Sequence, residues 1–221
     1  YGYFYGLDIE SKNGVVIIAG GIQSSAERYL YAVTFFVDNG WCVFCYDGTG
    51  VGKSDGDSLV GLPQNKVDLI NAIDFVRQEP KLTSLPLVLY GHSVGGYASL
   101  AAINDRPEEI AAVVSMGAFE APAKTMHYHA KQYVGILADI EYPFLCFHNW
   151  MLFGNDANES AIDAINSTDI PILIIEGSDD KIVPKDISIG NRLGDITNPN
   201  VSYIEIDDDG RNGHSTMWLS A

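Results

Sequence analysis

The chain of 221 residues lacks long hydrophobic runs and has few cysteines and few basic residues. No segment reaches the ~18 consecutive apolar residues that a membrane span needs, and no secretory signal peptide is visible, so we expect no integral membrane segment. Lysine and arginine number 13 against 29 acidic residues, which gives a formal net charge of −16. Such a surface repels nucleic-acid phosphates and anionic lipid, so we expect neither as the main partner.

The three cysteines do not have the spacing of a disulfide framework or a redox site. Cys42 and Cys45 share one short apolar run, and residues three apart on a strand point to opposite faces of the sheet. We therefore expect plain core cysteines in a reducing compartment, the cytoplasm. The sequence starts at Tyr1 without a methionine and stops shortly after His214, so we also expect a trimmed chain.

Short β-rich apolar runs alternate with longer helical patterns, without repeats or low-complexity tracts. Strands are expected at 15–19, 41–46, 85–90, 110–116, 171–176 and 201–206, and helices at 25–39, 65–78 and 95–104. This alternation predicts one α/β domain over residues 1–221, with a mostly parallel sheet flanked by helices. The stretch 118–168 is rich in aromatic residues and histidine, breaks the alternation, and predicts a small helical lid insertion.

The turn between the expected strand 85–90 and the helix after it carries Ser93. A serine hydroxyl is a poor nucleophile unless a base lies within hydrogen-bond reach and the side chain is accessible. A sharp strand-to-helix turn exposes the side chain and leaves the next backbone N–H free, and Gly91 and Gly95 supply the small residues that such a turn needs. We predict Ser93 as a nucleophile; the alternative is a tight turn whose serine caps the helix.

An acid and a histidine should follow the serine in that order, each just after a strand. The loop after 171–176 offers both Asp179 and Asp180, and a position near the end of such a loop favours Asp180. His214 follows the last expected strand in a glycine-rich loop and is the predicted base. Both aspartates remain candidates from position alone.

The other polar clusters predict no metal site and no cofactor. His92 points away from the nucleophile and is interpreted as structural. The aspartates at 207–209 lack the spacing of a calcium loop, which favours a solvated loop. The histidines of the insertion lack metal-ligand spacing and are interpreted as partly buried lid residues: His127, His129 and His148.

Acyl transfer also needs donors for the developing oxyanion and a pocket for the acyl group. We predict the backbone N–H of Val94 as one donor and that of Ile22, after Gly20-Gly21, as the other. Aromatic and apolar residues of the insertion could line an acyl or aryl pocket, or instead pack the insertion's own core. The substrate-binding candidates are Tyr128, Phe147, Trp150 and Met151.

Four segments together resemble motifs of the α/β-hydrolase superfamily, in the branch of serine aminopeptidases, monoacylglycerol lipases and small esterases. They are Gly91–Gly96, Asp47–Ser54, Gly177–Pro184 and Gly213-His214. The resemblance implies the α/β-hydrolase fold and gives the role of catalytic acid to Asp180. One departure concerns the oxyanion loop, where the family often has His-Gly and this chain has Gly20-Gly21.

These residues and the resemblance predict a serine hydrolase that cleaves a carboxylic ester or thioester of a small-molecule acyl substrate through an acyl-enzyme on Ser93. An aminopeptidase acting on small peptides is the first alternative, for which Glu120 and Glu141 could bind the substrate amine. A non-catalytic binding protein on the same fold is the second. The sequence leaves the oligomeric state open.

Overall fold

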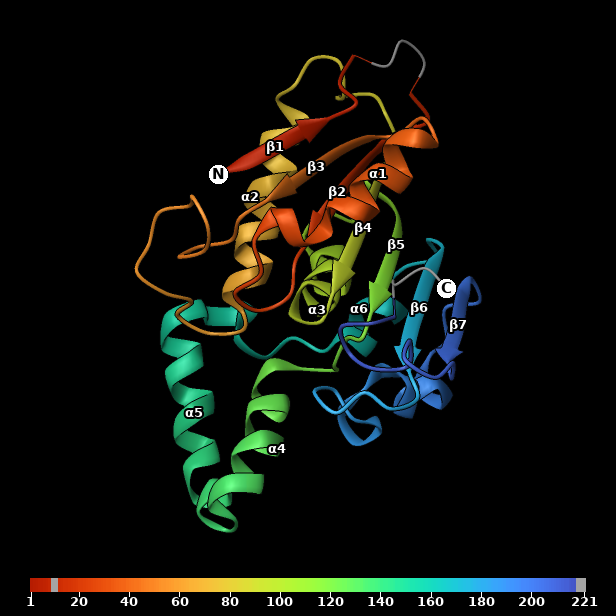
Figure 1. Ribbon diagram of the computed structural model, residues 1–221. Coiled ribbons are helices and arrows are strands. Elements are labelled where there is room, and N and C mark those ends of the chain that lie inside the picture. The colour runs from red at the N-terminus through yellow and green to blue at the C-terminus, as the bar shows by residue number, and fades with distance from the viewer. Residues whose placement is uncertain (9–11, 218–221) are drawn as a thin grey trace.

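A computed structural model describes residues 1–8 and 12–217 (Figure 1). Its seven strands form one sheet in the order β1-β3-β2-β4-β5-β6-β7. They are β1 (Gly2–Tyr5), β2 (Val15–Ala19), β3 (Cys42–Tyr46), β4 (Leu87–His92), β5 (Ile110–Met116), β6 (Ile172–Gly177) and β7 (Val201–Ile206). Only β1 runs antiparallel to its neighbour, so the predicted mostly parallel sheet is confirmed.

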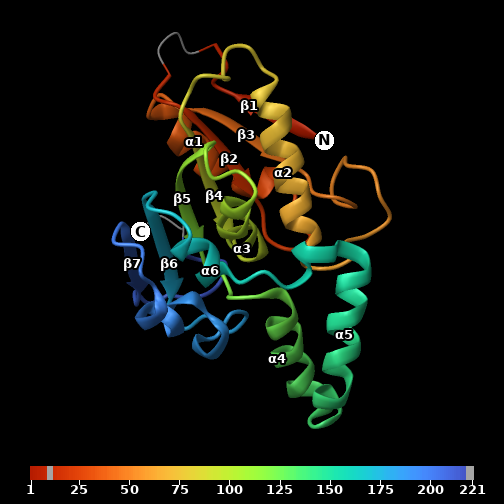
Figure 2. The same ribbon diagram turned by 180° about the vertical axis from the view of Figure 1, so that it is seen from behind.

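Helices cover both faces of the sheet, as the alternation of strands and helices predicted. The α-helices are α1 (Leu30–Asp38), α2 (Gln64–Arg77), α3 (Val94–Ala101), α4 (Pro122–Val134), α5 (Leu137–Phe153) and α6 (Ala161–Asn166). The 3₁₀ segments are η1 (Ala26–Tyr29), η2 (Ala102–Asn104), η3 (Gly154–Asn158), η4 (Lys185–Ile187) and η5 (Ile189–Asp195). Helix α1 lies on one face, and α2, α3 and α6 lie on the other (Figures 1 and 2).

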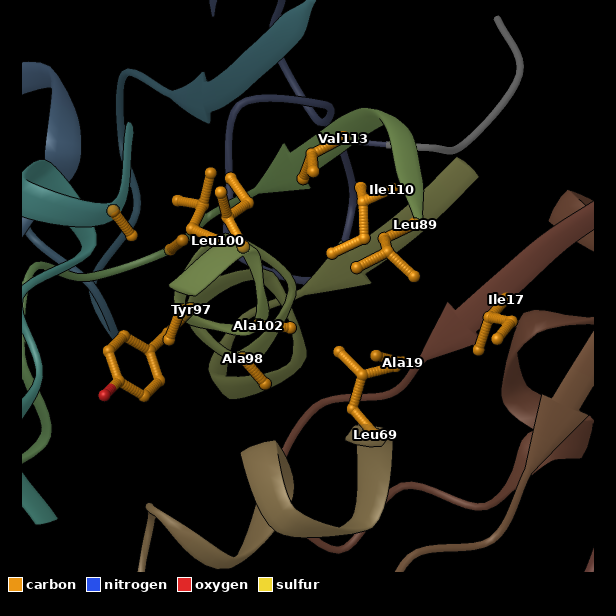
Figure 3. Close-up of a cluster of buried hydrophobic side chains, with 14 of the residues drawn as sticks. Ile17, Ala19, Leu69, Leu89, Tyr97, Ala98, Leu100, Ala102, Ile110 and Val113 are labelled. Atoms are coloured by element: carbon orange, nitrogen blue, oxygen red, sulfur yellow. The ribbon is translucent and has the colours of Figure 1, made fainter. Parts of the chain in front are cut away.

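Successive residues of the central strands point to opposite faces and build two hydrophobic clusters. In β2, Val15 and Ile17 join the cluster with α2 and α3, whereas Val16 and Ile18 join the cluster with α1. Figure 3 shows the first cluster, in which side chains of α2 and α3 meet those of β4 and β5. A strand buried on both faces reads as a continuous apolar run, which explains why this strand was predictable.

Cys42 and Cys45 follow the same rule. Cys42 lies in the cluster with α2 and α3, Cys45 lies in the cluster with α1, and both are free and buried. The prediction of separate core cysteines on opposite faces of one strand is therefore confirmed.

Two apolar residues of these helices are exposed. Leu30, at the start of α1, is 44% exposed where the chain leaves the tighter turn η1. Phe75 of α2 is also exposed, and its ring stacks on Phe4 of the edge strand β1 with 5.9 Å between centroids. Strand β1 was not predicted, because its four residues are too few to show alternation.

Helices α4 and α5 project together from the rest of the molecule (Figures 1 and 2). We call them the helical arm. The predicted insertion 118–168 contains this arm, but its end also contains α6, which is buried against α3 in the main core. The predicted boundary at 168 therefore extends too far. No helix within the described residues is long and apolar enough to cross a bilayer.

A buried lysine fixes the base of the helical arm to the sheet domain. Lys66 of α2 is fully buried, and its Nζ lies 2.6 Å from Asp105 and 2.8 Å from Asp156 and also pairs with Glu159. Asp156 lies in η3 directly after the arm, and Glu159 follows it. One cation therefore joins α2, the end of η2 and the return segment of the arm.

Candidate active site

Ser93 occupies a strained turn between β4 and α3. Its φ of 58° and ψ of −123° lie in a region that residues with side chains seldom adopt. The Ser93 backbone N–H donates to the Met116 carbonyl at 2.8 Å, and a Cβ on Gly95 would lie 2.1 Å from the Ala19 carbonyl oxygen. The strain is thus maintained by β5 and by close packing of α3 on β2, as expected for a turn that presents a nucleophile.

Asp180, and not its neighbour Asp179, contacts His214. Asp180 Oδ2 lies 2.6 Å from His214 Nδ1, and Oδ1 accepts the backbone N–H groups of Ile182 and Val183 at 2.8 and 2.7 Å. The Asp180 side chain is 4% exposed, whereas that of Asp179 is 58% exposed and pairs with a surface lysine. An ionised carboxylate only accepts, so His214 Nδ1 donates and its Nε2 is free to accept a proton.

His92 connects His214 to the segment beside Ser93. A carbonyl oxygen only accepts, so His92 Nε2 donates to the His214 backbone oxygen at 2.8 Å. His92 Nδ1 is then an acceptor, and the Tyr29 hydroxyl donates to it at 3.0 Å. The Tyr29 oxygen in turn accepts the Gly21 N–H at 2.7 Å. A single tautomer of His92 therefore satisfies every bond in this network.

This environment also fixes the charge of His92. Burial, and secondarily the neighbouring His214, lowers the pKa of His92 to about 4. The imidazole is therefore neutral near neutral pH and retains the tautomer that the network needs. The sequence predicted His92 as structural, and nothing in it indicated that Tyr29, 63 residues away, is its partner.

His214 packs against His92, the residue next to Ser93. The rings of His92 and His214 are 4.8 Å apart, and His92 directly precedes Ser93. Within the described part of the chain, no direct hydrogen bond joins Ser93 Oγ to His214. Such catalytic bonds are often long before substrate binds and tighten in the complex.

The segment after β2, where one of the oxyanion donors was predicted, runs alongside Ser93. A Cβ added to Gly21 would lie 3.4 Å from Ser93 Cβ. The Gly21 N–H is already bonded to Tyr29, so Ile22 has the next N–H along this segment. The Val94 N–H lies in the first turn of α3, where backbone donors have no partner within the helix.

Glu176 is a buried acid near this site that the sequence did not single out. Burial raises the pKa of Glu176, while its carboxylate accepts from the Ser188 hydroxyl at 2.9 Å and the Gly190 N–H at 2.8 Å. Ser188 also forms an isolated bridge with Phe119. Glu176 therefore fixes the segment that follows Asp180. In the sequence, the one feature that could have indicated this role is that Glu176 is a polar residue at the end of an apolar run.

The other acidic motifs are structural or solvent-exposed. Asp47 is buried, and its two oxygens accept the N–H groups of Ala26 and Lys53 at 2.8 and 2.9 Å. It thereby joins the start of η1 to the loop after β3. The aspartates at 207–209 are exposed, as expected for a solvated loop.

The four predicted substrate-binding residues lie in two places. Tyr128 lines a cavity of about 250 Å³ between α4 and the segment containing Asp186 and Ile187, which follows the Asp180 loop. The other three lie exposed on α5: Phe147, Trp150 and Met151. Of the predicted lid histidines, His127 binds Asp139 of α5 at 2.9 Å.

The protein-family model of serine aminopeptidase, S33, matches residues 10–145. The chain belongs to this family. Its fold is the α/β-hydrolase fold.

Individual members of the fold have low sequence identity to this chain. The uncharacterized protein YfhR of Escherichia coli O157:H7 is 28% identical over 170 residues, which is 76% of this chain and 53% of that protein. The chain spans about half the length of the curated relatives it matches.

Two solved structures share the fold. Esterase Pf2001 of Pyrococcus furiosus aligns with a TM-score of 0.71 and 20% identity, covering 96% of this chain and 78% of that chain. The monoacylglycerol lipase of Paleococcus ferrophilus aligns with a TM-score of 0.66 and 19% identity, covering 97% of this chain and 90% of that chain.

Proposed function

We propose that this chain hydrolyses a carboxylic ester or thioester through an acyl-enzyme on Ser93. The observation that carries the proposal is the 2.6 Å contact between Asp180 and His214, beside a serine in a strained strand-to-helix turn. An acid that orients a histidine next to an activated serine is the arrangement of nucleophilic acyl transfer.

In the first step, Ser93 Oγ attacks the acyl carbon while His214 Nε2 takes the hydroxyl proton. Negative charge develops on the carbonyl oxygen, and the N–H groups of Val94 and Ile22 stabilise it. His214 then gives its proton to the leaving alkoxide or thiolate. Asp180 keeps Nδ1 protonated and stabilises the imidazolium throughout.

In the second step, a water molecule attacks the acyl carbon and His214 Nε2 takes a proton from it. The bond from the acyl carbon to Ser93 Oγ breaks, the serine regains its proton from His214, and the free acid leaves. Each residue thus returns to its starting state. We assign the acyl substrate to the arm side of the site, with Tyr128 as the contact residue that lines a cavity there.

An aminopeptidase is the second candidate, because the family description names that activity. It would need an available acid for the substrate's ammonium group. Glu120 is already bonded to Lys124 at 2.8 Å and to Arg192 at 2.8 Å, so its charge is neutralised. Glu141 is exposed on the arm. The pairing of Glu120 favours an ester over a peptide substrate, as do the esterase and the lipase that share the fold.

The experiment compares p-nitrophenyl esters of graded chain length with amino-acid p-nitroanilides, using wild-type protein and Ser93→Ala. We expect ester turnover that falls by at least about 10⁴-fold in the variant, with unchanged thermal unfolding. Retained turnover in Ser93→Ala would contradict the mechanism. Faster release of p-nitroaniline from the anilides than of p-nitrophenol from the esters would establish the aminopeptidase. A folded wild-type protein that is inactive on both panels would favour a binding role.

A further inference from the structure

Helix α5 has an apolar stripe that no described part of the chain covers. Its members recur with spacings of three, four, three and four residues, which places them along one side of a helix. We call this set the α5 stripe: Leu137, Ile140, Phe144, Phe147 and Met151. Their exposed fractions lie between 59 and 71%.

The opposite side of α5 packs against α4. Ala138 is buried and Tyr142 is half-buried, on the side where α5 packs against α4. Only two charged residues, Asp139 and Glu141, occur between residues 137 and 153. A continuous exposed apolar surface is uncommon in a monomeric protein, so the α5 stripe needs an occupant.

The size of the surface fits a protein interface. Ile136 and Trp150 flank the α5 stripe and are also exposed. Since an aromatic side chain has ~150–250 Å² of surface, the stripe and its flanks expose on the order of 800–1,000 Å². The largest apolar patch of a typical monomer is about 300–600 Å², whereas each partner in a stable complex buries about 800 Å².

We propose that the α5 stripe is a dimerisation surface on which the same stripe of a second copy packs. The three-four spacing is the spacing with which paired helices interlock their side chains. The stripe carries no charge, so two copies can meet there about a twofold axis without bringing like charges together. The arm projects from the sheet domain, which leaves this side open to another arm (Figures 1 and 2).

Charge argues against a lipid surface as the occupant. Interfacial helices are rich in lysine and arginine on the polar side, and α5 contains neither. The two lysines of α4 are already paired, Lys124 with Glu120 and Lys131 with Asp139. The net charge of −16 further opposes contact with anionic lipid.

The dimer gives a role to three side chains that the sequence suggested for substrate. Phe147 and Met151 belong to the α5 stripe, and Trp150 stacks on Phe147 with 6.0 Å between ring centroids. In the dimer they contact the partner's arm. This inference is independent of the hydrolytic mechanism, since it requires neither Ser93 nor His214 to act.

Sedimentation velocity over a protein concentration series tests the dimer. We expect the wild-type protein to have twice the mass of the 24.1 kDa chain in the micromolar range. Phe144→Glu/Phe147→Glu should raise the dimer dissociation constant at least about 100-fold, because truncating buried aromatic residues at the centre of an interface has effects of this size. The matched control is Phe35→Glu, since Phe35 is 61% exposed on α1, away from the stripe, and its replacement should leave the dimer intact.

Three results would overturn the proposal: a monomeric wild-type protein at ~100 µM, a double variant that stays dimeric, or dissociation by Phe35→Glu alone. Flotation with phosphatidylcholine vesicles, with and without phosphatidylglycerol, completes the test. We expect no binding to either, and stripe-dependent binding by monomeric protein would show that lipid is the occupant. If circular dichroism shows that the glutamate variant misfolds, Phe144→Ser/Phe147→Ser provides the same comparison.

Discussion

Replacing Asp180 by asparagine changes one atom at the centre of the proposed mechanism. The new amide oxygen can still accept the N–H groups of Ile182 and Val183, so the loop keeps its shape. Its NH₂ group then faces His214 Nδ1 at the position of the present 2.6 Å contact. A donor at this position forces Nδ1 to accept, which moves the His214 proton to Nε2.

The wrong tautomer removes the base that Ser93 needs. A histidine protonated on Nε2 cannot take the serine proton, and the charge of the imidazolium is no longer compensated. We expect kcat to fall by about 10⁴-fold, equivalent to about 5 kcal/mol of activation free energy. The melting temperature should change little, because the backbone contacts of the loop remain.

Asp179→Asn is the matched control for this prediction. Asp179 is the adjacent residue with the same side chain, but it is exposed and pairs only with Lys181. We expect kcat to change by less than about threefold, because a solvent-exposed pair contributes little. Initial rates on a p-nitrophenyl ester for both variants provide the comparison. A larger loss in Asp179→Asn than in Asp180→Asn would refute the assignment of the acid.

Three further predictions concern the surroundings of the site. The pKa of His92 is about 4 in the folded state and ordinarily 6.5, so the unfolded chain binds a proton first as pH falls. The free energy of unfolding should therefore drop by about 3 kcal/mol between pH 6.5 and 4. Urea titrations of His92→Gln should show a free energy of unfolding that varies less with pH over this range. Lys66→Met leaves three carboxylates without their shared cation and should cost about 3 kcal/mol in chemical denaturation, whereas Lys131→Met at an exposed pair should cost less than about 1 kcal/mol. Gly95→Ala should lower stability by about 3 kcal/mol or more, since its Cβ would collide with the β2 backbone. The control is Gly194→Ala, whose Cβ would meet nothing within 4 Å. Equal melting temperatures for the two variants would contradict the close packing of α3 on β2.

The central strands and the residues of the Asp180–His214 contact could be predicted because local sequence determines them. β2 is buried on both faces and therefore reads as an unbroken apolar run. The turn at Ser93 needs small residues at fixed offsets, and Asp180 and His214 each follow a strand that ends at the same edge of the sheet. Periodicity and chain order together were sufficient for these features.

The remaining features depend on contacts between distant parts of the chain. The link from Gly21 through Tyr29 and His92 to His214 uses two backbone groups, which leave no signature in side-chain identity. Glu176 is recognisable only when β6 and the segment after Asp180 are in place. The helical arm ends before α6 because α6 packs on α3, and tertiary packing of this kind is not visible in composition.

The decisive measurement is the site at which a fluorophosphonate attaches to the folded protein. We expect one covalent adduct, found by peptide mass spectrometry on Ser93, absent in Ser93→Ala and formed much more slowly in His214→Ala. Labelling of a different residue, or no labelling of well-folded wild-type protein, would contradict it.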